Sequence, residues 1–192
     1  MKTSKLIITI IAVLSLSSAF TACKNNNSNS NSAQSTNNTI KKQPTKAELL
    51  ATIHSLEQKV FEDSTGTINR GPAIELILKY SQYANLFPQD TISPDYLFQA
   101  ADLSRGIGDG KTAIIFYKRL IKNYPNANKR AISIFLTAFT YENLMNDTAN
   151  ARKYYTQFLK EYPKHEFADD AKMSLKYLGK TPEEIVKSFQ KK

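Results

Sequence analysis

The chain has 192 residues, 41% of them hydrophobic, and its 26 Lys and Arg against 17 Asp and Glu give a formal net charge of +9. This length and composition provide one globular domain of ordinary size and do not indicate two. A single cysteine excludes an intramolecular disulfide, and with only two histidines the usual ligand sets of zinc and iron–sulfur sites are missing, which argues against a metalloenzyme.

Residues 1–22 have the layout of a secretory signal peptide. Lys2 and Lys5 precede an apolar run that reaches Leu16, and small residues follow it. A retained membrane anchor is the alternative, because the uncharged stretch is at the lower limit of a membrane span. The stretch that follows, Ala19-Phe20-Thr21-Ala22-Cys23, resembles the bacterial lipobox. The resemblance implies cleavage before Cys23 and acylation of its sulfur, typically with palmitate, so Cys23 is expected to be a lipid anchor and not a nucleophile.

The segment 23–43 is expected to be a flexible tether. It is rich in Asn and Ser, lacks acidic residues and contains Ile40 as its only large apolar residue. Such a segment cannot bury enough surface to offset the entropy of ordering, and its root-mean-square reach is roughly 25 Å. Some Bacteroidetes lipoproteins carry acidic residues after the cysteine as a surface-export signal. Residues 24–27 lack them, which favours an outer-membrane protein that faces the periplasm.

The remaining chain, 44–192, is expected to be an all-α domain. Thr45 and Glu48 form a capping-box pattern at the start of the first helix. Apolar residues then recur every three or four positions, at Leu49, Leu50, Ile53, Leu56, Val60 and Phe61. No segment shows the sustained alternation of a half-buried strand, so a sheet is not indicated.

Three segments repeat one pattern: 80–88, 117–125 and 155–163 each contain an aromatic residue, a bulky apolar residue three positions on, a second aromatic four later, and then proline. The prolines are 37 and 38 residues apart, and Ala113 and Ala151 precede the first aromatic by four. The turn residues Asp109 and Asp147 also match. Each unit is therefore predicted to be a helix, a turn, a second helix and a proline stop, and such units must stack to bury both faces.

These positions resemble the tetratricopeptide repeat, which implies a right-handed stack of about three helix-turn-helix units. The first copy departs from the pattern, with Leu76 in place of alanine and a longer connection containing Gly66 and Gly71-Pro72. In an exported, lipidated chain the repeats are similar to those of the outer-membrane barrel-assembly lipoprotein and of the Tol–Pal-associated periplasmic coordinator. After the third unit, 166–177 is predicted to be a helix closed by Gly179. A last helix opens at Thr181-Pro182-Glu183-Glu184, whose apolar residues Ile185, Val186 and Phe189 are expected to cap the stack.

The glycine-rich segment 106–112 is not predicted to bind phosphate. The phosphate-loop pattern requires glycine where Arg105 stands, and a strand should lead into it, whereas this segment follows a helix. Adjacent acidic pairs such as Asp169-Asp170 point in different directions on a helix, and no nucleophile-elbow or zinc-protease motif occurs. The chain is therefore not expected to be an enzyme, to hold a cofactor or metal, or to act on a small-molecule substrate.

A basic stripe is predicted at Lys111, Lys118 and Lys122, on one face of a helix and opposite Ile114, Ile115, Leu120 and Ile121. It is either a solvated face or a site for an anionic partner such as lipid headgroups, lipopolysaccharide or an acidic protein segment. Export removes nucleic acid as a partner.

In repeats of this family the first helices line a concave groove. By register these positions are Phe98, Asp102, Arg105, Leu136, Thr140 and Asn143. They are either partly buried against neighbouring helices or the binding surface for a partner.

The sequence thus favours a lipid-anchored, non-catalytic protein-interaction scaffold in the bacterial envelope, serving outer-membrane assembly or maintenance. The alternative is a binding module for anionic wall or lipid polymers.

Overall fold

The computed structural model describes residues 43–60 and 67–190. The leader, Cys23, the tether up to residue 42, Phe61 and Gly66 lie outside the described residues. The described part of the chain forms eight helices and no strand, as predicted. The helices are α1 (Lys46–Val60), α2 (Arg70–Leu86), α3 (Ser93–Gly106), α4 (Gly110–Asn123), α5 (Arg130–Asn143), α6 (Thr148–Glu161), α7 (Ala168–Tyr177) and α8 (Pro182–Gln190).

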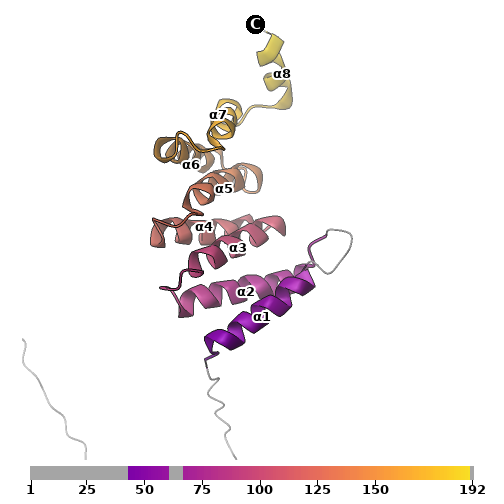
Figure 1. Ribbon diagram of the computed structural model, residues 1–192. Helices are drawn as coiled ribbons and strands as arrows, with labels where there is room; N and C mark the ends of the chain where they lie inside the picture. Colours follow the sequence, from indigo (N-terminus) through magenta and orange to yellow (C-terminus); the bar gives the residue numbers. More distant parts are fainter. Residues whose placement is uncertain (1–42, 61–66, 191–192) are drawn as a thin grey trace, which may run out of the picture. The chain divides into compact units, whose positions relative to one another are not determined.

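The helices pack in sequence order, so that α1 to α6 form three helix pairs and each pair rests on the next (Figure 1). The repeated aromatic positions fill the core: Tyr117, Tyr155 and Phe158 are fully buried. Ala113 and Ala151 are also fully buried, which confirms the predicted small-residue position where paired helices approach. All four core clusters lie within 42–192, which forms one compact unit with a core of its own.

The turns between units are built alike. After each second helix the chain makes two successive backbone hydrogen bonds, the first closing on the aromatic residue before the proline. In the first turn the backbone N–H of Asp90 donates to the Phe87 carbonyl, and the backbone N–H of Ser93 donates to the Asp90 carbonyl. The same pair of bonds recurs 37 and 75 residues later. The first unit therefore ends in the same turn as the other two, although its sequence departs most from the repeat pattern.

The turns within units are fixed by helix caps. Asp109 and Asp147 each accept a hydrogen bond from a backbone N–H three residues on, at 3.1 and 2.9 Å. Thr45 and Glu48 form the predicted capping box, with the Thr45 N–H donating to Glu48 Oε2 at 2.8 Å. Such caps contribute about 1 kcal/mol each and explain where these helices begin.

Three details of the sequence interpretation need correction. Gly71 and Pro72 lie in the first turn of α2 and not in the connection before it, because proline needs no hydrogen-bond partner there. Helix α7 begins at Ala168, since the turn after Tyr162 extends to that residue.

The third correction concerns α8, which forms as predicted and carries the Thr181–Glu184 capping box. Two of its three apolar residues, however, do not cover the stack: Val186 is 54% and Phe189 60% exposed, whereas Ile185 is half-buried. The physical reason is that α7 has 10 residues where α3 and α5 have 14, so the chain turns about one helical turn early. The ring of Phe189 lies beside that of Tyr177, at 5.8 Å between centroids.

Candidate functional site

The candidate site is a groove with a volume of about 540 Å³, lined by residues of α1, α2 and α3 and by Ile68 just before α2. It is called here the first-helix groove. Its wall on α3 carries Phe98, Gln99, Asp102 and Arg105, and Glu57 lines it from α1. The floor is apolar, formed chiefly by Ile68, Leu76 and Leu103. Concave, mostly apolar surfaces with a few fixed polar groups are typical binding sites.

The charged groups of the groove are held in place by one another. Arg105 donates to Asp102 Oδ1 from Nη2 at 2.7 Å and from Nε at 3.2 Å. The hydroxyl of Tyr117 donates to the same oxygen at 3.3 Å. Burial first, and then the Asp102 carboxylate, raise the pKa of Tyr117, so this hydroxyl stays protonated and remains a donor. The groove thus presents a preformed ion pair that needs no reordering to meet a ligand.

A tyrosine–carboxyl hydrogen bond like that between Tyr117 and Asp102 occurs in each of the three units. The repeated tyrosine of each second helix, at position 80, 117 or 155, donates to a carboxyl group of the first helix in the same unit. Tyr80 donates to Glu57 at 2.7 Å, and Tyr155 donates to Glu142 at 2.7 Å. Burial is the main cause of a raised pKa in both tyrosines, and the acidic partner adds to it. These three pairs tie the two helices of every unit together along the first-helix side.

The structure brings together only half of the residues predicted for partner binding. Phe98, Asp102 and Arg105 line the groove, whereas Leu136, Thr140 and Asn143 do not. Leu136 packs against the cluster around Tyr117. Asn143 is exposed, with its amide donating to the Phe139 carbonyl at 2.9 Å.

Thr140 is the clearest error of the register argument. It is fully buried, and its hydroxyl donates to the carbonyl of Leu136 at 2.6 Å. It therefore presents nothing to a partner. The acidic residue that faces the second helix in this unit is Glu142, two positions further on.

Sequence reasoning missed the contributions of α1 and α2 to the groove. Glu57, Ile68, Leu76 and Tyr80 line it, but the connection between these helices departs from the repeat and hides their register. The usable signal was Leu76 itself: a large side chain at the position held by alanine in the other units must fill space beside the groove.

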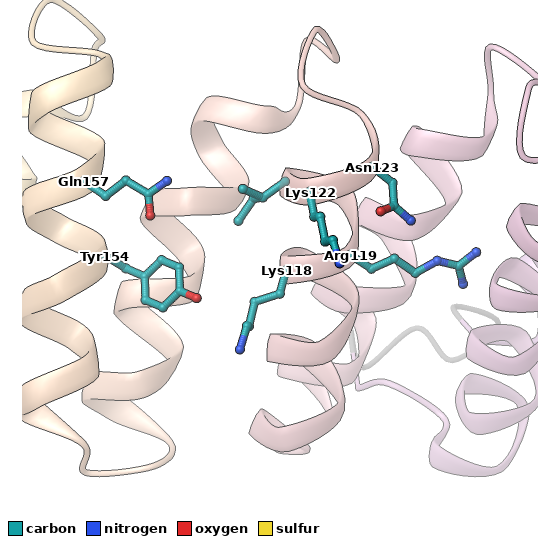
Figure 2. Close-up of a pocket in the computed structure, with 7 residues that line it drawn as sticks. Lys118, Arg119, Lys122, Asn123, Tyr154 and Gln157 are labelled. Atoms are coloured by element: carbon teal, nitrogen blue, oxygen red, sulfur yellow. The ribbon is translucent and has the colours of Figure 1, made fainter. Parts of the chain in front are cut away.

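The basic stripe lies on α4 as predicted, with Lys111, Lys118 and Lys122 all exposed. The prediction placed Ile115 on the opposite, apolar side, and this is wrong because Ile115 is 63% exposed. Positions 111, 115, 118 and 122 follow helical spacing, so Ile115 lies within the stripe. Lys118 and Lys122 line a hollow of about 470 Å³, which is also lined by Tyr154 and Gln157 of α6. Figure 2 shows the two lysines on one helix and Tyr154 and Gln157 on another.

The glycine-rich segment is the turn between α3 and α4, as predicted. Gly108 has φ +80° there, a conformation that favours glycine. Gly110 opens α4 against Leu144, whose Cβ would lie 2.9 Å from an added Cβ. The backbone conformation at Gly108 and the close packing at Gly110 therefore explain why glycine occupies these two positions.

Among the described residues there is no group of three or more His, Cys, Asp or Glu side chains placed to hold a metal ion. None of the described helices combines the length and hydrophobicity needed to cross a membrane.

Comparison with known families gives one match. Residues 95–127 and 133–165 each match the tetratricopeptide repeat, and they span α3–α4 and α5–α6 with the turns that follow. No curated protein sequence matches the chain. The two matched segments are similar to tetratricopeptide repeats, and together with the packed helix pairs they support a TPR-like helical stack. Repeats of this kind generally bind protein partners and are non-catalytic interaction modules.

Proposed function

We propose that this protein is a membrane-anchored scaffold of the bacterial cell envelope that docks another envelope protein in the first-helix groove. The observation that carries the proposal is the groove itself: an apolar floor beside a preformed Asp102–Arg105 ion pair, on repeats of a protein-binding family. Such a site suits an apolar side chain of the partner flanked by groups that hydrogen bond to the ion pair.

Anchoring is the second part of the proposal. The signal-peptide pattern and the lipobox resemblance at Cys23 support export, acylation and attachment to the outer membrane on its periplasmic side. A role in outer-membrane assembly or maintenance follows from the similarity of the repeats to those of envelope lipoproteins. Mass spectrometry of the membrane-extracted protein tests this part, since acylated Cys23 at the amino terminus is expected and an unmodified thiol would contradict it.

Affinity purification from solubilised membranes tests the docking. The groove variant combines Gln99→Arg with Arg105→Gln, and the control combines Thr156→Arg with Arg152→Gln on α6. Both keep the net charge, and Thr156 and Arg152 are exposed. We expect a stoichiometric partner that survives moderate salt, is lost with the groove variant and is kept by the control. Equal retention by the two variants would contradict docking in this groove.

A further inference from the structure

Charge is divided unevenly between the two kinds of helix. The second helices of the three pairs, α2, α4 and α6, carry nine Lys and Arg against two acidic residues, Glu75 and Glu161. Glu161 is paired with Arg130, and α4 has no acid at all. The first helices α1, α3, α5 and α7 are close to neutral, with six basic and seven acidic residues. The excess positive charge of the described helices therefore sits on the second helices.

The second helices also expose large apolar side chains at matching positions. Leu78 on α2 and Ile115 on α4 lie 37 residues apart, two positions before the repeated tyrosine, and are 62% and 63% exposed. Because they occupy the same place in successive units, they point to the same side. Ile74 is one helical turn before Leu78 and 46% exposed. In the third unit this position is an exposed lysine, Lys153.

The residues form one surface because the second helices are neighbours. Arg119 of α4 donates to the Ala84 carbonyl of α2 at 3.2 Å, and α4 faces α6 across the hollow in Figure 2. We call this surface the second-helix face. It is defined by Ile74, Leu78, Lys111, Ile115, Lys118 and Lys122. It shares no residue with the first-helix groove.

We propose that the second-helix face lies on an anionic lipid bilayer. Lysines in this number attract any polyanion, but a soluble anionic polymer without apolar groups gains nothing from exposed leucine and isoleucine. The interface of a bilayer accommodates both, since apolar side chains enter the boundary of the acyl chains while lysines meet the headgroups. The inference goes beyond docking in the groove and does not depend on acylation.

Cosedimentation with vesicles tests the proposal. The unit 42–192 contains its own core and lacks Cys23, so it is used alone. We expect it to bind vesicles of phosphatidylglycerol mixed with phosphatidylcholine and not vesicles of phosphatidylcholine alone. Lys111→Gln, Lys118→Gln and Lys122→Gln together are expected to weaken binding about a hundredfold, roughly fivefold for each charge. The control triple changes Lys59, Lys164 and Lys187 to Gln, which removes the same charge from exposed sites elsewhere.

A second variant pair separates a bilayer from a soluble polymer. Leu78→Ser with Ile115→Ser is expected to weaken vesicle binding roughly tenfold and to leave retention on immobilised polyphosphate unchanged. Thermal unfolding of each variant confirms that it is folded. Equal losses in the two lysine triples would overturn the proposal, because net charge alone would then explain binding. So would vesicle binding that ignores the two serines, since the occupant would then be a soluble anionic polymer.

Discussion

The tyrosine–carboxyl pairs give the sharpest test of how the units are held together. Replacing Tyr80, Tyr117 or Tyr155 by Phe removes one hydroxyl and leaves the ring in place. Tyr80 donates to Glu57 and Tyr155 donates to Glu142, both at 2.7 Å. In each case the tyrosine is the residue of the second helix that donates a hydrogen bond to this carboxyl group. Hydrogen bonds to charged groups contribute about 1.5 kcal/mol or more when they are partly buried, so each loss is expected to cost about 1.5 kcal/mol.

Tyr117→Phe is expected to cost less, about 0.5 kcal/mol, because its bond is 3.3 Å long and Asp102 keeps Arg105 as a partner. The assay is urea unfolding of the unit 42–192, with unchanged dependence on urea as the sign that only stability has changed. Tyr124→Phe is the control, since its hydroxyl donates to the Pro88 carbonyl at an exposed site where water can replace it.

A double-mutant cycle assigns the energy to the pair. Tyr155→Phe and Glu142→Ala together should cost less than the sum of the two single changes, by about 1 kcal/mol. A coupling free energy near zero would refute the reasoning. So would a loss for Tyr117→Phe larger than those for Tyr80→Phe and Tyr155→Phe.

Three further predictions concern stability. The pKa of Asp90 is lowered to about 2 by hydrogen bonds from the Lys46 ammonium, the Ile92 N–H and the Tyr83 hydroxyl. The contribution of Asp90 to folding stability is therefore complete above pH about 4 and is lost as pH falls towards 2. Asp90→Asn should make the unfolding temperature less dependent on pH over that interval. Ala113→Leu should cost about 1–3 kcal/mol by overpacking, whereas the exposed control Ala149→Leu should stay within about 0.5 kcal/mol, as read from urea unfolding. Gly108→Ala should cost about 1 kcal/mol from its positive φ alone, since nothing lies within 4 Å of the added Cβ, and equal thermal unfolding of the variant and the parent would contradict this.

The helix pairs could be predicted from sequence because they follow from local chemistry. Each unit is specified by residues within it: the repeated aromatic positions, the proline that ends the second helix, a small residue where the helices approach and an Asp helix cap. The neighbouring units need not be known. The helix register of the first unit was harder to predict, since Leu76 and the longer connection depart from the repeat pattern. The exposure of the apolar residues of α8 could not be predicted, because it depends on where α7 ends and not on the amphipathic pattern of α8.

Site residues were predictable only where the repeat register determines the side a residue faces. Phe98, Asp102 and Arg105 line the groove, and their binding to a partner stays a prediction. Thr140 was not, because a threonine can turn its hydroxyl to the carbonyl one helical turn back and be buried. Ile115 was misplaced because its apolar character was taken as a sign of burial, whereas it lies in the lysine stripe. Hydrophobicity does not by itself fix the side of a helix.

The central claim is that a protein partner occupies the first-helix groove. Hydrogen–deuterium exchange of the purified protein with and without its isolated partner tests it most directly, because exchange reports protection element by element. Docking in the groove should slow exchange in the part of α1 around Glu57 and in α3 when the partner is bound, and leave α4 and α6 unchanged. Protection confined to α4 and α6, or no protection in α3, would contradict it.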